Sequence, residues 1–421
     1  MRIKPTPLLL LLLSLLLFTA CQPAPVATAA PLRSPQPATP ISEPASTPEV
    51  PATQAPPEPS PVPTQTHAAS AQAPATAAPN AYKGIVLARV WIYADQSGWA
   101  TDLQQTKVFH TFDAGKTWRD VSPALGRGTT NLFFLDGKTG WISQNISESN
   151  TYIWHSTDGG VKWLRFSQAN PGGILSFSNT LNGFVLITLD AGMSHQSVEI
   201  QQTADGGATW VTRWKHLPEE AEASLPSSGN KNHIMVLDPN NLLLTGTWPV
   251  PKSLYAFQSD NSGYSWNQVQ CAGIPELGSS DMWDAQAPLA STPGSLVLPV
   301  RAFASVGVDK TFFCISSDRG RTWVFASQLD AAVLHSFTSS GAGLSAGANT
   351  IYRTEDGAQS WQPLPFNPPA GQAIIDLVLA DSQNAYLLTS SLQTGPYAPA
   401  FLYASRDGGQ TWVLLTSEIV N

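Results

Sequence analysis

The sequence reads Ser316-Ser-Asp-Arg-Gly-Arg-Thr-Trp323 at one point, and it repeats variants of this eight-residue phrase about seven times. Two further clear copies are Thr111–Trp118 and Ser405–Trp412, and the shared pattern is Ser/Thr-x-Asp-x-Gly-x-Thr-Trp. Successive copies lie roughly 40 to 57 residues apart, which is close to the period of β-propeller blades. The repeat therefore predicts a chain built from similar units.

Each phrase has the composition of a self-supporting turn. An Asp in a tight turn accepts hydrogen bonds from backbone N–H groups just ahead of it, Gly supplies positive φ, and the hydroxyls satisfy further backbone groups. The terminal Trp begins the next strand and can bury about 150–250 Å² against a neighbouring unit. We expect the Asp to be structural, because no second carboxylate recurs in the phrase to make it a metal ligand or a catalytic acid. The Asp position holds Asp113, Asp158, Asp205, Asn261, Asp318, Asp356 and Asp407, and the Trp position holds Trp118, Trp163, Trp210, Trp266, Trp323, Trp361 and Trp412.

This pattern resembles the Asp-box (BNR-like) repeat of sialidases, other glycoside hydrolases, sortilin-type receptors and the photosystem II stability/assembly factor family. In those proteins the repeat marks the turn between the last two strands of a propeller blade. A Gly-Trp pair that opens the second strand, as at Gly98-Trp99 and Gly140-Trp141, makes the photosystem II family the most similar. The resemblance covers residues from about 82 to the end, and it implies an architecture rather than an activity.

The region from residue 81 to 421 is strand-like throughout. In the first unit we expect strands at Ile85–Tyr93, from Gly98, at Lys107–Phe112 and at Thr117–Val121. Apolar runs alternate with Gly, Asn, Asp and Ser turns, and no convincing amphipathic helix is found. We predict an all-β fold, a seven-bladed propeller of four-stranded antiparallel blades with Asp-box turns between the third and fourth strands. Because blades bury their faces against each other, the domain is expected to close as a monomer.

The first 80 residues read as export and tethering segments. Residues 1–20 combine Arg2, Lys4 and a leucine run, which is typical of a signal peptide. Phe18-Thr19-Ala20-Cys21 resembles the lipobox of bacterial lipoproteins, which implies lipidation of Cys21 and an anchor on the outer face of a bacterial membrane. Residues 21–80 are rich in Pro, Ala and Thr and hold no aromatic residue, which predicts a disordered linker.

Charge and cysteine content restrict the partners. The net charge is −8, only 12% of residues are charged, and there is no basic stripe, which disfavours nucleic acid. Cys271 and Cys314 could form a disulfide in an oxidising compartment, but we favour two buried thiols because chain packing separates their strands. No Cys/His spacing predicts a metal site, and no cofactor is expected.

Long connections point to a binding face opposite the Asp boxes, because long loops on a rigid scaffold often carry function. The expected long loops are Gln144–Tyr152, Asp190–Val198, Thr247–Ser253, Ser391–Ala400, Lys215–His233 and Ala272–Ser295. Exposed aromatic residues on such loops are enriched at interfaces and can stack on sugars. The candidate binding residues are Trp248, Trp283, Tyr397, Trp214, His216 and Asp281. The alternative is that each Trp packs into its own blade.

Three functions fit these observations. The favoured one is a non-catalytic binding or assembly module, anchored in the cell envelope, that binds a protein or glycan partner. The second is a sialidase-like glycoside hydrolase, with Asp281 and Asp284 as candidate carboxylates, although no arginine trio of the sialidase kind is evident. The third is a photosystem II assembly factor in the strict sense, but this chain lacks the arginine-rich face that the resemblance implies.

Overall fold

The computed structural model describes residues 87–125, 130–147, 150–168, 172–192, 195–216, 224–275, 282–303, 309–391 and 400–420. The predicted signal peptide, Cys21, the linker, Asp281 and Tyr397 lie outside the described residues. The described residues form strands and no helix, which confirms the all-β class, and none of them belongs to a helix able to cross a membrane.

The strands form six sheets in the described part of the chain. The first contains β1 (Leu87–Ile92), β2 (Gly98–Asp102), β3 (Val108–Thr111), β4 (Thr117–Asp120) and β31 (Glu418–Val420). The second contains β5 (Thr130–Phe134), β6 (Gly140–Ser147), β7 (Asn150–Ser156) and β8 (Leu164–Gln168). The third contains β9 (Ile174–Phe177), β10 (Gly183–Gly192), β11 (His195–Thr203) and β12 (Val211–Lys215).

The fourth sheet has ten strands. They are β13 (Asn230–Val236), β14 (Leu242–Thr247), β15 (Leu254–Ser259), β16 (Asn267–Gln268), β17 (Cys271–Ala272), β18 (Met282–Ala285), β19 (Leu289–Ala290), β20 (Leu296–Phe303), β21 (Asp309–Ser316) and β22 (Trp323–Asp330). The fifth contains β23 (Leu334–Phe337), β24 (Gly343–Ala346), β25 (Ile351–Thr354) and β26 (Gln362–Leu364). The sixth contains β27 (Ala373–Leu379), β28 (Ala385–Ser390), β29 (Ala400–Ser405) and β30 (Val413–Leu414).

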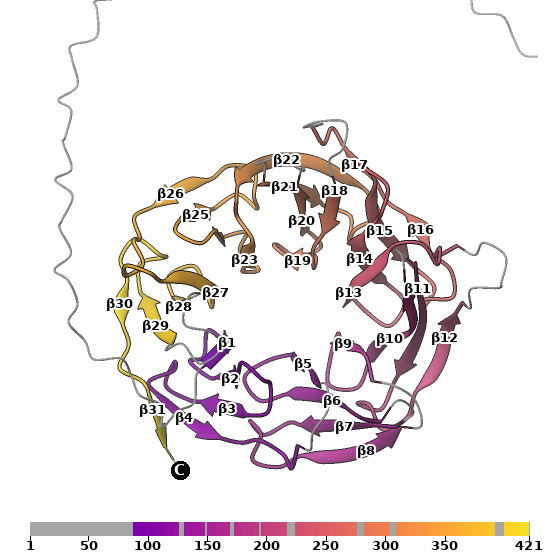
Figure 1. Ribbon diagram of the computed structural model, residues 1–421, viewed down its shortest axis with the longest axis horizontal. Coiled ribbons are helices and arrows are strands. Elements are labelled where there is room, and N and C mark those ends of the chain that lie inside the picture. The colour runs from indigo at the N-terminus through magenta and orange to yellow at the C-terminus, as the bar shows by residue number, and fades with distance from the viewer. Residues whose placement is uncertain are drawn as a thin grey trace, which may run out of the picture. The chain divides into compact units, whose positions relative to one another are not determined.

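These sheets follow one another in chain order around a ring, which is the arrangement of a β-propeller (Figure 1). The first strand of each four-stranded antiparallel run lies innermost, and neighbouring inner strands such as β23 and β27, or β27 and β1, contact each other. The ten-stranded sheet contains two such runs, β13–β16 and β19–β22, which β18 connects through the pair Thr247↔Asp284.

The repeated phrase forms one turn geometry at every copy. In the turn at Asp318, the carboxylate accepts hydrogen bonds from the Thr322 N–H (2.9 Å) and the Thr322 hydroxyl (2.7 Å). The Ser316 hydroxyl oxygen accepts a bond from the Gly320 N–H (2.8 Å), and Gly320 adopts the positive φ of +85° that the turn requires. At Asn261 the amide group replaces the carboxylate and donates to the Ser265 hydroxyl (2.8 Å). These bonds account for the recurrence of Ser/Thr, Asp and Thr in the phrase.

At three junctions, the segment that follows one repeat contacts the outer strand of the next repeat. Trp163 at the start of an outer strand donates its indole N–H to the Val121 carbonyl of the preceding repeat (2.7 Å). The last strand closes the ring in the same way, because β31 pairs in parallel with β4 and places Ile419 opposite Trp118. Trp118 is fully buried in a core cluster shared with the last sheet. The Trp of the phrase therefore stabilises the junction between neighbouring repeats.

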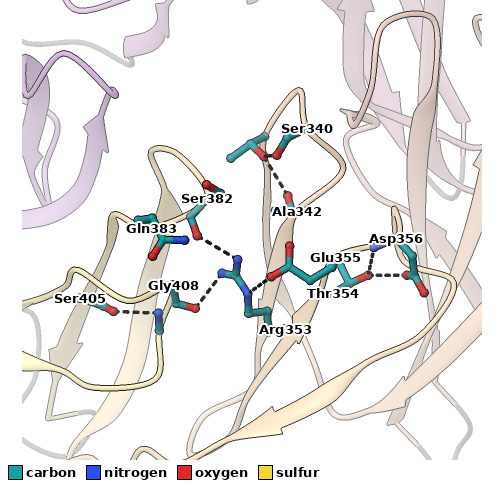
Figure 2. Close-up of polar contacts among 12 residues, drawn as sticks. Ser340, Ala342, Arg353, Thr354, Glu355, Asp356, Ser382, Gln383, Ser405 and Gly408 are labelled. Carbon is teal, nitrogen blue, oxygen red and sulfur yellow. Dashed lines mark hydrogen bonds and ion pairs between the residues drawn. The ribbon is translucent and has the colours of Figure 1, made fainter.

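A second set of contacts joins neighbouring repeats at the side chain three positions before the Asp. These contacts join His110 Nε2 to Gly137 O (2.6 Å), Gln202 Nε2 to Pro239 O (3.1 Å) and an Arg353 guanidinium nitrogen to Ser382 O (2.9 Å). Figure 2 shows Arg353 reaching from β25 to the neighbouring sheet, where it also donates to the Gly408 carbonyl (2.7 Å). In these three copies a long polar side chain reaches a carbonyl of the next repeat, whereas Ile315 and Ala404 hold the same position and have no side-chain donor.

Two sequence expectations were wrong. Cys271 and Cys314 form a disulfide, with a Cα–Cα distance of 6.1 Å. The chain after β16 crosses to the next run, where β17 pairs in parallel with β22 and places Cys271 next to the neighbouring strand β21. The expected loops at residues 144–152 and 190–198 are largely strand, because β6, β7, β10 and β11 extend into them. Backbone pairing continues there although the side chains turn polar.

Candidate functional site

A cavity of about 940 Å³ lies along the inner strands, between β1, β13, the β18–β19 segment, β23 and β27. Its polar lining includes Arg89, His233, Asp284 and Asp376, and its aromatic lining includes Trp91. It is large enough for several residues of an extended chain or a few sugar units. We take it as the candidate functional site because it collects charged groups of both signs from strands far apart in the sequence.

Backbone irregularities place three of these side chains. β1, β13 and β27 each carry a register shift, and Arg89, His233 and Asp376 are the first paired residues after it. An extra residue in a strand changes the direction of the following side chain, and such bulges are frequent beside functional sites. The three residues occupy the same position of their repeats, two before the residues that pair with Trp99, Leu243 and Tyr386.

Asp376 is a carboxyl group held at the junction of the last and first repeats. Its Oδ2 accepts a hydrogen bond from the Val90 N–H (2.7 Å), and its Oδ1 accepts one from the Leu377 N–H (3.1 Å). Burial raises the pKa of Asp376, while the Val90 hydrogen bond and the charge of Arg89 oppose that rise. The group is therefore easier to protonate than an exposed carboxylate.

Asp284 and His233 form a second polar group in the same lining. The Thr247 hydroxyl donates to Asp284 Oδ1 (2.8 Å) and fixes that carboxylate beside β14. Burial lowers the pKa of His233, and the negative charge of Asp284 only partly opposes that effect. At neutral pH the imidazole is uncharged and can both donate and accept hydrogen bonds.

Arg89 supplies a positive charge at the cavity wall. Its guanidinium lies over the Trp91 ring, 5.0 Å from the centroid, and the residue is exposed. The Trp91 ring in turn makes an edge contact with Phe134 at 4.9 Å. A planar cation resting on an aromatic face is a geometry suited to carbonyl, carboxylate or hydroxyl groups of a ligand.

None of the described candidates Trp214, His216, Trp248 and Trp283 lines this cavity. Trp283 is in β18, pairs with Ala302 and is buried in a core cluster, so its assignment to an exposed loop was wrong. His216 is also buried. Trp214 is half-buried against the core cluster that contains Phe257. Trp248 is half-buried as well, and its ring lies 5.1 Å from that of Tyr255.

Among the candidate residues that the structure describes, Asp284, which the sequence offered as a catalytic candidate, lines the cavity. Arg89, His233 and Asp376 were missed as site residues. A signal exists for Arg89 and Asp376, because each is a polar residue within an otherwise apolar inner strand, whereas three other polar residues precede His233 in β13. Alone, such a residue looks like a strand surface position.

The turn aspartates remain apart from the cavity and act on the backbone. Partial burial alone would raise the pKa of Asp318, but the hydrogen bonds from Thr322 and Ser316 outweigh that effect and hold the pKa below its ordinary value. Within the described ranges, no group of three or more His, Cys, Asp or Glu side chains could hold a metal ion.

No protein family model matches the chain, and no curated protein is detectably similar in sequence. Solved structures do match. A structure of YCF48 bound to D1 peptide is 19% identical, with 68% of this chain and 82% of that chain covered and a TM-score of 0.43. YCF48 from Cyanidioschyzon merolae is 14% identical, with 80% and 87% covered and a TM-score of 0.44. A PL25 ulvan lyase is 11% identical, with 68% and 84% covered and a TM-score of 0.46. These similarities assign neither a family nor an activity to this chain.

Proposed function

We propose that this protein is a binding module that holds an extended segment of a partner protein in its central cavity. The observation that carries the proposal is the cavity itself, where strand irregularities place Arg89, His233 and Asp376 on one lining. An extended peptide offers carbonyl and N–H groups along its whole length, and a lining with donors and acceptors of both signs can pair with them.

The proposal also includes the number of blades and the attachment of the domain to a membrane. We count the ten-stranded sheet as two blades, β13–β16 and β19–β22, and on that count propose a ring of seven blades. Lipidation at Cys21 and the linker of residues 21–80 would display the domain, residues 81–421, on the outer face of a bacterial membrane. Mass spectrometry of the mature N-terminus tests the lipid, and a Cys21→Ser variant should be released from the membrane fraction.

The binding proposal is tested by cross-linking the full-length protein to native envelope proteins, with Arg89→Ala and Asp284→Asn as cavity variants. Asp330→Asn is the matched control, because Asp330 is exposed on β22. A discrete partner captured by the wild type and the control, and lost in both cavity variants, would support the proposal. Equal capture by all four proteins would refute the assignment to the cavity.

A glycan-acting enzyme is the second candidate, and one observation favours it. Asp376, whose pKa burial raises, and Asp284 line the same cavity, and glycoside hydrolysis uses a carboxylic acid with a raised pKa together with a second carboxylate. Incubation with a mixed glycan library separates the two functions. Released sugar that disappears in both Asp376→Asn and Asp284→Asn would replace the binding proposal, whereas retention without cleavage would identify a glycan as the ligand.

A further inference from the structure

Lys231 is a buried cation without a counter-ion among the described residues. It is the second residue of β13, and only 2% of its surface is exposed. Its Nζ lies close to four backbone carbonyl oxygens, those of Gln196 (2.8 Å), Ser227 (2.9 Å), Gly229 (3.1 Å) and Ser228 (3.3 Å). No described carboxylate forms an ion pair with it.

The four oxygens come from two separate stretches of chain. Gln196 is in β11, whereas residues 227–229 form the irregular segment that leads into β13. Gln196 also binds this segment through its backbone, because its N–H donates to the Ser227 carbonyl (2.8 Å), and its side-chain oxygen accepts a bond from the Lys231 N–H. The ammonium therefore lies where β11 and this segment meet.

We call the four carbonyl oxygens around Lys231 Nζ the carbonyl cage. The ring of Tyr255 lies against the same ammonium group. Its ring centroid lies 5.4 Å from Lys231 Nζ, within the range of a cation–π interaction, and its hydroxyl donates to the Pro226 carbonyl (3.4 Å). Gly229 has a φ of +80°, and a Cβ there would meet the Tyr255 ring at 2.6 Å, so the segment lies directly against the ring. Trp248 packs on the same ring.

Backbone carbonyl dipoles, rather than a carboxylate, compensate the positive charge of the Lys231 ammonium. A buried charge is costly unless polar groups replace its hydration shell, and an ammonium has only three N–H donors for these four oxygens. Burial lowers the pKa of Lys231 to about 7, so the charged form predominates below neutral pH. Rings of backbone carbonyl oxygens are also what proteins use to replace the hydration of a free monovalent cation.

We propose that Lys231 acts as an internal cation whose carbonyl cage fixes residues 226–229 and the Tyr255–Trp248 pair, and that the cage binds a free primary ammonium ion when the lysine side chain is shortened. The cage lies at the start of β11, whereas the repeated turn at Asp205 follows the end of that strand. It sets the position of Trp248 through Tyr255 and does not depend on occupation of the central cavity.

Chemical rescue tests the proposal on the full-length protein at pH 6. Lys231→Ala should melt about 4–8 °C below the wild type, and excess n-propylammonium should restore at least half of that loss. 1-Propanol has the same apolar stem without the charge and should restore none. Lys107→Ala is the matched control, because Lys107 is exposed and pairs with Asp120 at the surface, and it should neither lose stability nor respond to the amine.

Two results of the melting experiments would overturn the proposal. One is a Lys231→Ala protein that melts within about 1 °C of the wild type, and the other is equal rescue by 1-propanol, which would show that the stem matters and the charge does not. If Lys231→Ala does not fold, Lys231→Met retains the stem and gives the second measurement. Amide exchange in residues 224–230 should then be at least about tenfold faster than in the wild type, with exchange in β1–β4 unchanged. Unchanged exchange at 224–230 would also refute the cage.

Discussion

Arg353 provides the sharpest test of how neighbouring repeats hold together. Its guanidinium donates to the Gly408 carbonyl (2.7 Å) and the Ser382 carbonyl (2.9 Å), both in the following repeat. It also forms an ion pair with Glu355 (Figure 2). Only 9% of the Arg353 side chain is exposed, whereas the Glu355 side chain is 66% exposed. The Glu355 contact should therefore contribute little, and the two carbonyl bonds should dominate.

The expected magnitude follows from those two bonds. A hydrogen bond to a charged donor contributes about 1.5–3 kcal/mol, and the two bonds share one guanidinium, so their sum is an upper bound. Arg353→Met retains much of the apolar stem and leaves both carbonyls without this donor. We expect the free energy of unfolding to fall by about 3–5 kcal/mol. Arg353→Lys keeps the charge but loses the planar fork, so it should lose roughly half as much.

Thermal and urea unfolding of the full-length protein measure this effect. In a domain of this size, a loss of 3–5 kcal/mol corresponds to a fall in melting temperature of roughly 4–7 °C. Arg321→Met is the matched control, because Arg321 is exposed in the neighbouring turn phrase, and it should change the melting temperature by less than about 1 °C. If Arg353→Met melts like Arg321→Met, the contacts between repeats do not contribute as argued.

Four further predictions concern other parts of the domain. Reduction of the Cys271–Cys314 disulfide, which spans 43 residues of sequence, should lower the free energy of unfolding by about 4 kcal/mol, and a urea midpoint that is unaffected by reductant would contradict this. Burial lowers the pKa of His335 from its ordinary 6.5 to about 3, so between those pH values the unfolded chain binds more protons than the folded chain. The free energy of unfolding should therefore fall as the pH drops through that range, by up to about 1.4 kcal/mol per pH unit. The fall should be shallower in His335→Gln. Asp318→Ala should cost about 1–3 kcal/mol through lost turn hydrogen bonds, and a melting curve that matches the wild type would remove the structural account of the phrase. Trp283→Ala should lower the free energy of unfolding by about 3–5 kcal/mol because the side chain is in the core. A stable variant that loses only partner binding would instead support Trp283 as an exposed binding residue.

Much of the fold could be read from the chain because the information is local and repeated. The phrase around Asp318 contains its own hydrogen-bond partners within eight residues, so each turn forms wherever those residues occur. Alternating apolar residues then define the strands between the turns. The phrase therefore predicted the class of the fold without any long-range information.

The sites depended on contacts that no local pattern encodes. Cys271 meets Cys314 because a connecting segment crosses to the next outer strand, and Trp283 enters the core because its segment adds a strand between β14 and β20. Both segments read as irregular loops in the sequence. Backbone pairing between distant segments needs no particular side chain, so composition did not reveal it.

The sequence by itself determined the turns, the strand periodicity and the all-β class, because each of these is fixed by residues within one repeat. The tertiary structure decided that Arg89, Asp284 and Asp376 line one cavity, since they lie in different strands that meet only when the ring closes. It also decided the cage of Lys231, whose four carbonyl oxygens belong to the backbone and leave no trace in residue type. Local chemistry encodes the repeat, and closure of the ring creates the sites.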